Sequence, residues 1–107
     1  MKATILGLKI CDTCRKARKA LPEAAFRDIR EIPLTEQEID ALLSQFGDRL
    51  INRASTTWRG LEDGARGAPP ADLIAAHPAL MKRPVIQTES GDLLGWTTQT
   101  RAALGLE

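Results

Sequence analysis

The N-terminal part of the chain alternates between strand-like and helix-like patterns, and this order restricts the folds open to it. Residues 3–8 form a short apolar run with β-branched members, which is typical of a buried strand. Residues 12–21 follow a helical pattern that Pro22 ends. Residues 25–29 predict a second strand. A strand, a crossover helix and a second strand predict a βαβ unit with parallel strands.

The clearest helical pattern comes next. Thr35 and Glu38 match a capping box, in which each side chain satisfies a backbone N–H of the first turn. Apolar residues follow at helical spacing, and Gly47 supplies the C-terminal stop. Residues 52–67 are polar and predict a loop with a short helical turn. A further short helix is expected before Pro78, which ends it.

Two apolar runs near the C-terminus predict a β-hairpin. We expect strands at 85–88 and 93–96, joined by a loop over 89–92 that contains a glycine. Thr97 can then cap a last helix that ends near Gly105.

The resulting order is βαβ, a helical insertion at about 35–78, a β-hairpin and a C-terminal helix. This is the element order of the α/β thioredoxin-like fold, with a mixed four-stranded sheet. The length of 107 residues predicts a single domain over 1–107. Fold alone does not give function, so the function has to be argued from a site.

The charge balance excludes some partners. Fifteen basic and fourteen acidic side chains give a net charge of +1, which provides no bulk attraction for nucleic acid or for an anionic membrane. The first apolar run is too short for a signal peptide, and no stretch is long enough to span a bilayer. We therefore expect a cytoplasmic protein, in which two cysteines indicate redox or metal chemistry.

Cys11 and Cys14 form a Cys-x-x-Cys motif at the predicted start of the first helix. Free N–H groups and the helix dipole favour a thiolate there, and such positions lower the thiol pKa. The side chain of Asp12 opposes this shift. Four basic side chains of the same helix add to it: Arg15, Lys16, Arg18 and Lys19.

The i, i+3 spacing allows the two sulfurs to form a reversible disulfide. We expect Cys11, which lies nearer the helix start, to attack and Cys14 to resolve the mixed disulfide. Two alternatives stay open. One is a zinc half-site, although zinc takes four ligands and only His77 and carboxylates could complete the set. The other is a pair of inert buried cysteines.

Three segments occur in an order that resembles the ArsC/Spx family, the arsenate-reductase-like branch of thioredoxin-fold proteins. They are Cys11-Asp12-Thr13, the stretch 52–59, and the His-Pro-x-Leu-x-x-Arg-Pro spacing of residues 77–84. The resemblance implies that Cys11 is the nucleophile and that Arg83 holds an oxyanion beside it. It also implies a cis bond before Pro84, which faces the active site. Arg53 lies where the family keeps another anion-binding arginine.

Trp96 stands where arsenate reductases of this type carry a third arginine, and an aromatic wall suits a larger ligand such as glutathione. The resemblance thus implies a thiol-disulfide oxidoreductase of a short Cys-x-x-Cys subgroup, linked to glutathione or glutaredoxin. We expect it to act on a small thiol or disulfide as a monomer, with glutathione as co-substrate, no tightly bound cofactor and no metal. The alternative is an Spx-like, redox-sensing transcription regulator that binds RNA polymerase.

Overall fold

The computed structural model describes residues 2–106, which divide into two compact units. The first unit joins residues 2–29 to residues 83–106. The second is the segment between them, Arg30–Lys82. The helical insertion expected at about 35–78 falls within this second unit.

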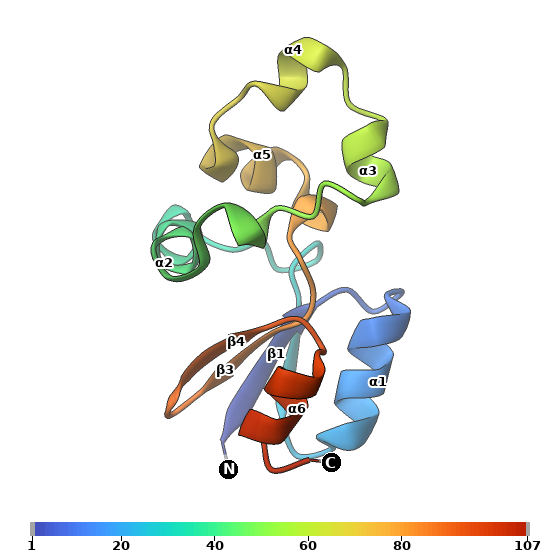
Figure 1. Ribbon diagram of the computed structural model, residues 1–107, viewed down its shortest axis with the longest axis vertical. Helices are drawn as coiled ribbons and strands as arrows, with labels where there is room; N and C mark the ends of the chain where they lie inside the picture. The colour runs from blue at the N-terminus through green and yellow to red at the C-terminus, as the bar shows by residue number, and fades with distance from the viewer. Residues whose placement is uncertain (1, 107) are drawn as a thin grey trace. The chain divides into compact units, whose positions relative to one another are not determined.

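The first unit contains a mixed four-stranded sheet in the order β2-β1-β3-β4 (Figure 1). Its strands are β1 (Ala3–Gly7), β2 (Ala25–Asp28), β3 (Val85–Thr88) and β4 (Gly91–Leu94). Helix α1 (Asp12–Ala20) connects β1 to β2, which run parallel, whereas β3 is antiparallel to both β1 and β4. The predicted βαβ unit and mixed sheet are confirmed.

Helices α1 and α6 (Thr98–Ala103) lie on the same side of this sheet (Figure 1). Ile5 and Ile86 are paired across β1 and β3, and they form one buried cluster with Ala17 of α1 and Leu104 after α6. Burying an isoleucine side chain contributes roughly 1.5–3 kcal/mol. The cluster therefore holds both helices against the two central strands.

The hairpin differs from its prediction. The expected loop over 89–92 and strand over 93–96 are wrong, because β4 begins at Gly91 and only two residues separate the strands. The Thr88 hydroxyl donates to the Gly91 carbonyl at 2.7 Å and accepts from the Ser90 N–H at 3.2 Å. Gly91 has a φ of 133°, which a residue with a side chain rarely adopts, so glycine permits this tight turn.

Side-chain caps begin two of the helices as predicted. The Thr35 hydroxyl accepts from the Glu38 N–H at 3.1 Å, and the Glu38 carboxylate accepts from the Thr35 N–H at 2.8 Å. This capping box begins α2 (Glu36–Phe46). The Thr97 hydroxyl accepts from the Thr100 N–H at 3.0 Å at the start of α6. An N-cap of this kind contributes about 1 kcal/mol.

In the second unit, α2 packs against α5 (Pro70–Ala76). Two 3-10 helices, η1 (Gly47–Leu50) and η2 (Pro78–Leu80), follow α2 and α5, and Ile51 bridges to Met81. None of the helices within residues 2–106 is long and apolar enough to cross a membrane. The core of this unit is aliphatic: Ile39, Leu42, Leu50, Ile51, Leu73, Ile74, Leu80 and Met81.

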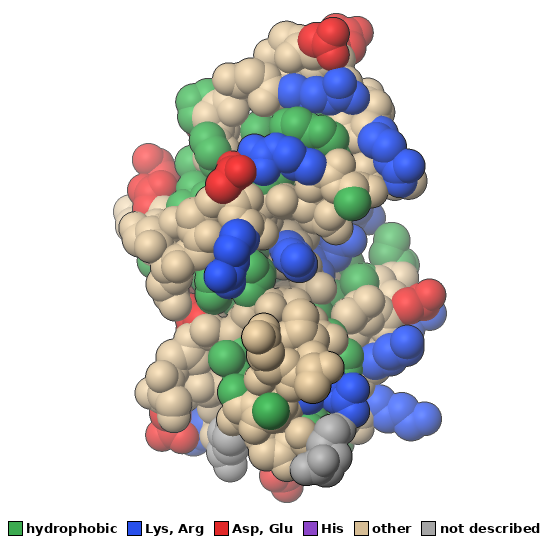
Figure 2. Space-filling model, in the orientation of Figure 1, with side chains coloured by type: hydrophobic (Ala, Val, Ile, Leu, Met, Phe, Trp, Pro, Cys, Tyr) green, Lys and Arg blue, Asp and Glu red, His purple; other side chains and the backbone are tan. Residues whose placement is uncertain are grey.

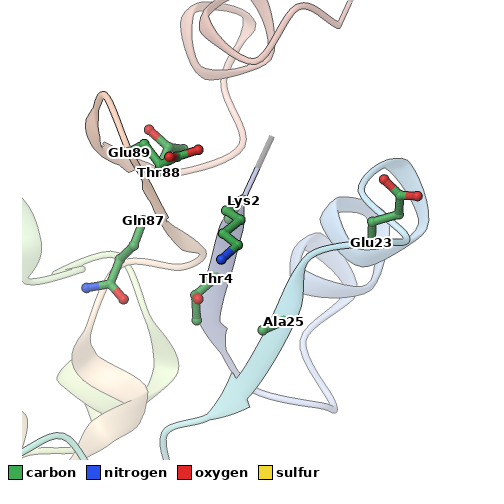
Figure 3. A pocket seen from close by; sticks show the side chains of 8 residues that line it. Lys2, Thr4, Glu23, Ala25, Gln87, Thr88 and Glu89 are labelled. Carbon is green, nitrogen blue, oxygen red and sulfur yellow. The ribbon is translucent and has the colours of Figure 1, made fainter.

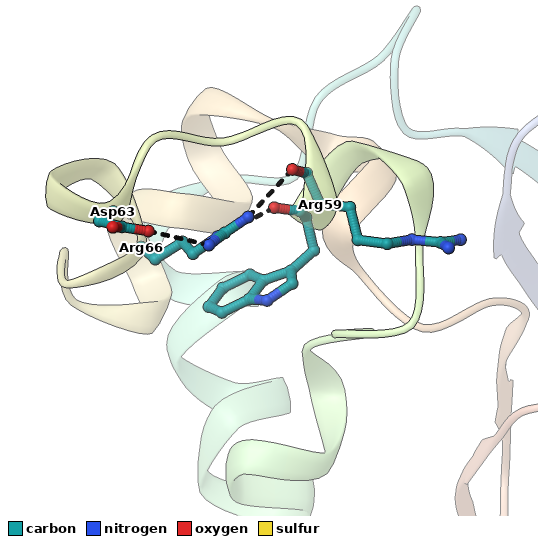
Figure 4. Close-up of polar contacts among 4 residues, drawn as sticks. Arg59, Asp63 and Arg66 are labelled. Carbon is teal, nitrogen blue, oxygen red and sulfur yellow. Dashed lines mark hydrogen bonds and ion pairs between the residues drawn. The ribbon is translucent and has the colours of Figure 1, made fainter.

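The predicted polar loop over 52–67 contains two helical turns, α3 (Thr56–Arg59) and α4 (Asp63–Arg66), whose residues are all at least partly exposed. Arg66 links these turns (Figure 4). Its guanidinium donates to the carbonyls of Trp58 and Arg59 at 3.2 and 2.9 Å, and it pairs with Asp63 at 3.0 Å. Hydrogen bonds to backbone carbonyls therefore replace apolar burial in this segment.

Candidate active site

Cys11 is the N-cap residue of α1, at the end of a short loop that follows β1. Two contacts hold the loop to the end of β2. The Lys9 N–H donates to the Asp28 carboxylate at 2.9 Å, and the Ile29 N–H donates to the Gly7 carbonyl at 2.9 Å. Cys11 is only partly exposed. Its sulfur can thus be approached from outside while the backbone beneath it is fixed.

The pKa of the Cys11 thiol is lowered, in the predicted direction. Burial is the largest single cause and raises this pKa. The polar N–H and the thiol of Cys14 lower it, as do the N–H donors and positive charge of Arg83, and together they outweigh burial. Cys11 makes no side-chain hydrogen bond of the usual N-cap geometry. The Cys14 N–H at the third helical position therefore acts on the sulfur mainly as a nearby dipole.

The basic side chains of α1 were expected to lower the pKa of Cys11, but they are not among the groups that do so. Arg83, far away in sequence, is the cation that acts on Cys11. The basic side chains of α1 named from the sequence are all exposed, so solvent and salt screen their charges: Arg15, Lys16, Arg18 and Lys19.

Cys14 has the opposite environment. Its side chain is completely buried, and burial raises its pKa to about 12, with the neighbouring Cys11 adding to the rise. The backbone of Leu8 and the charge of Arg83 oppose this shift but do not cancel it. Both cysteines are free thiols. The two sulfurs are therefore neighbours of different reactivity, one poised to ionise and the other holding its proton.

Gly7, at the end of β1, makes room for Cys14. A Cβ atom on Gly7 would collide with the Cys14 sulfur and would lie 3.3 Å from its Cβ. Gly7 was not predicted as a site residue from the sequence. An isolated glycine inside a strand pattern often marks a close approach by another group, and that signal was available.

Arg83 and Pro84 lie directly before β3 and are joined by a cis peptide bond, as the resemblance implied. Arg83 is half-buried, and its N–H donors and positive charge lower the pKa of the Cys11 thiol. A guanidinium offers several N–H donors in a plane, so it can stabilise the thiolate and also hold an anionic group of a substrate. The structure brings Cys11, Cys14 and Arg83 together.

Arg53 belongs to the second unit and is already engaged there. Its guanidinium binds the Asp48 carboxylate through two nitrogens at 2.7 and 2.8 Å and lies 5.1 Å from the centre of the Trp58 ring. Hydrogen bonding to Arg53 lowers the pKa of Asp48, and the same pair raises the pKa of Arg53. An anion would have to compete with this carboxylate, so the anion-binding role of Arg53 stays a prediction.

Trp96 is half-buried and packs against the cluster around Ile5 and Ile86. This contact accounts for its apolar ring, and its role in ligand binding also stays a prediction. Within residues 2–106 no three His, Cys, Asp or Glu side chains gather in a group able to hold a metal ion.

A separate hollow of about 870 Å³ lies over the sheet (Figure 3). Thr4 is paired with both Ala25 and Gln87 across the three strands beneath it, and Lys2 and Glu89 add charges of opposite sign. These residues lie at the edge of the sheet where β1 begins, whereas Cys11 follows the end of β1. The hollow is therefore distinct from the thiol site.

Comparisons with known proteins cover most of the chain. The family model described as the ArsC family matches residues 6–103. An uncharacterized protein of Haemophilus influenzae is 34% identical over 102 residues, covering 87% of this chain and 90% of that protein.

Two solved structures are similar as well. The YffB protein is 28% identical, with a TM-score of 0.84 over 94% of this chain and 96% of its own. An arsenate reductase (ArsC) related protein from Brucella melitensis is 32% identical, with a TM-score of 0.76 over 99% and 97%. These similarities confirm the thioredoxin-like fold class and the resemblance drawn from the sequence motifs.

Proposed function

Since the chain belongs to the ArsC family, we propose that it is a thiol-disulfide oxidoreductase, linked to glutathione or glutaredoxin, in which Cys11 attacks and Cys14 resolves. The observation that carries the proposal is a partly exposed thiol, Cys11 at the start of α1, beside a completely buried one, Cys14, with pKa values that shift in opposite directions. The thiolate is the nucleophile in disulfide exchange, so the shifts give the two sulfurs different roles.

In the first step, the Cys11 thiolate attacks a sulfur of a glutathione mixed disulfide. A bond forms between Cys11 and the glutathione sulfur, the original disulfide breaks, and the substrate thiolate leaves and takes a proton from water. The substrate is reduced, and Cys11 carries the glutathione. Arg83, whose N–H donors and charge already lower the pKa of Cys11, would hold a carboxylate of that glutathione.

In the second step, Cys14 ionises and its thiolate attacks the Cys11 sulfur, which releases glutathione. The mixed disulfide has by then removed the Cys11 charge, one of the causes that raise the pKa of Cys14. The Cys14 proton passes to the departing glutathione thiolate, which leaves as a thiol, and a Cys11–Cys14 disulfide remains. Because the Cys14 side chain is completely buried, it is shielded from thiols and disulfides in solution, and the Cys11 sulfur is its neighbour. Two further glutathione molecules, or a glutaredoxin dithiol, reduce this disulfide and are themselves oxidised to a disulfide.

An Arg83 series tests this function on a glutathionylated peptide. Cys11→Ser should abolish deglutathionylation, and Arg83→Ala should lower the rate roughly ten- to a hundred-fold, because one charge-assisted hydrogen bond contributes about 1.5–3 kcal/mol. Arg83→Lys keeps the charge and should retain more activity. Release of the peptide thiol is measured against time, with Lys16→Ala as a control on the same unit. An active Cys11→Ser variant would refute the assignment of the nucleophile.

Arsenate should be a poor substrate. A compact, multiply charged oxyanion needs several fixed donors around one point. Arg83 supplies one guanidinium, Arg53 is engaged by Asp48, and Trp96 offers a single N–H donor. A coupled arsenate reduction assay should therefore give little or no turnover under conditions in which the glutathionylated peptide is reduced. Efficient arsenate turnover would show that the Trp96 position does not restrict the ligand.

A redox-sensing regulator resembling Spx is the second candidate, since a reversible Cys11–Cys14 disulfide also suits a switch. Such a protein would bind RNA polymerase. Capture of polymerase subunits by the immobilised protein, in one redox state only, would favour this candidate over the enzyme.

A further inference from the structure

A basic groove runs beside α1, the helix that Cys11 begins. It is a hollow of about 520 Å³ lined by Arg15, Arg18 and Lys19 of α1, together with four apolar residues. We call these residues the α1 groove. Lys and Arg side chains gather over α1 in the space-filling view (Figure 2). The apolar members of the α1 groove lie at the end of α1 and on the way into β2: Leu21, Pro22, Ala24 and Phe26.

The cations of the α1 groove are available to a ligand. The Arg18 guanidinium lies 4.1 Å from the centre of the Phe26 ring, which supports it from one side and leaves its N–H edge open. Within residues 2–106, neither Arg18 nor Lys19 is paired with a carboxylate. The Nε of Arg15 donates to the Lys9 carbonyl at 3.1 Å. Arg15 also makes a 3.4 Å ion pair with Asp12, in which both side chains are largely exposed, so the ion pair costs little to exchange.

The α1 groove also lies within reach of the nucleophile. Lys19 is eight residues beyond Cys11 on the same helix, which corresponds to about 12 Å at the usual rise per residue. An extended peptide covers that distance in about four residues. A segment whose disulfide lies at Cys11 can therefore place the next few side chains along Arg15, Arg18 and Lys19.

We propose that the α1 groove docks an acidic segment of a protein disulfide partner and brings its disulfide to Cys11. This inference rests on the proposed thiol-disulfide exchange and narrows its substrate to proteins with carboxylates within about four residues of the reacting cysteine. Three cations along one helix attract such a segment, and complementary charge mainly raises the rate of encounter.

The mixed lining favours a peptide over a small anion. Phe26 and Pro22 offer apolar contact beside the cations, and Ile10, directly before Cys11, is 67% exposed. A peptide presents carboxylates and apolar side chains together, whereas an inorganic anion would leave the apolar walls unused.

The test uses three peptides of equal length, each with one cysteine joined by a disulfide to thionitrobenzoate. Positions two to five after the cysteine are Glu, Gln or Lys. The protein carries Cys14→Ser, so that only one sulfur reacts. The Cys11 thiolate bonds to the peptide sulfur, the peptide–thionitrobenzoate bond breaks, and the coloured thiolate leaves with the electron pair. Its release gives the second-order rate constant.

At low ionic strength the Glu peptide should react roughly ten times faster than the Gln peptide, and this ratio should fall towards one in high salt. Arg18→Gln/Lys19→Gln should also bring the ratio close to one. The control Lys2→Gln/Lys16→Gln removes the same charge away from the α1 groove and should retain the ratio. The inference would be overturned if the Glu and Gln peptides reacted at equal rates, or if the control variant lost the rate ratio as fully as Arg18→Gln/Lys19→Gln does. Either result would leave the exchange activity established.

If no peptide reacts, a binding measurement tests the docking role of the α1 groove separately from the proposed exchange activity. Cys11→Ser protein and fluorescent, disulfide-free peptides are then compared by anisotropy. Preference for the Glu peptide that is lost in Arg18→Gln/Lys19→Gln would support the α1 groove even though the proposed function had failed. Tighter binding of a single-stranded oligonucleotide or of anionic lipid vesicles at the same side chains would overturn the assignment to an acidic protein.

Discussion

Iodoacetamide is expected to alkylate Cys11 about a thousand times faster than Cys14 near neutral pH in the folded protein. The pKa of Cys14 is raised to about 12, whereas that of Cys11 lies below its ordinary value of 9.0. Each pH unit between them changes the relative thiolate population about tenfold. A lower pKa also reduces intrinsic nucleophilicity, but complete burial of Cys14 offsets this by excluding the reagent.

The measurement is a labelling rate against pH, resolved by peptide mass spectrometry. Cys11 should follow one titration below the pKa of a free thiol, and Arg83→Ala should move that titration upward because it removes a hydrogen bond and a positive charge from the thiolate. In denaturant the two thiols should react alike. A Cys11 titration at or above that of an unfolded thiol would contradict the thiolate assignment.

Gly7→Ala is expected to destabilise the protein although it replaces a glycine within a strand. An alanine there usually gains roughly 0.5–1 kcal/mol over glycine. Here the new Cβ would collide with the buried sulfur of Cys14. Overpacking of a core typically costs about 1–3 kcal/mol, and we expect a loss of this size in the free energy of unfolding. Urea denaturation measures it.

A double-mutant cycle assigns this cost to Cys14. Cys14→Ala removes the sulfur that the new Cβ would strike, so Gly7→Ala should cost clearly less in that background. Displacement of Cys14 in Gly7→Ala should also raise the pKa of Cys11, because Cys14 supplies two of the groups that lower it. The same cost in both backgrounds would show that Gly7 acts through another neighbour.

Much of the fold could be predicted because local signals agreed with each other. Thr35 with Glu38 and Thr97 with Thr100 form their caps from residues three apart, which a sequence displays directly. The hairpin failed for a physical reason: the Thr88 hydroxyl bonds both Ser90 and the Gly91 carbonyl, and this closes the turn two residues early. Propensity alone places Gly91 in the loop.

Only part of the candidate site could be predicted from local sequence patterns. Cys11 and Cys14 lie in one motif, so their pairing follows from local spacing. Arg83 is distant in the chain, and only the resemblance to a family identified it before the structure placed it at Cys11. The partner of Arg53 was missed because Asp48 carries no motif that distinguishes it from any exposed carboxylate.

The first unit is built from two separated stretches of chain, and this bears on how the molecule reaches its native state. β1 pairs with β3 only after the whole of Arg30–Lys82 has been enclosed as a loop. The entropy lost on closing a loop grows with the logarithm of its length, and each doubling costs only about 0.6 kcal/mol more. Inserted residues in the exposed turns held by Arg66 would therefore change folding speed and stability little. Two strand pairs, β1–β2 and the β3–β4 hairpin, can form without closing that loop, and a circular permutation that separated β1 from β2 would remove the first of them.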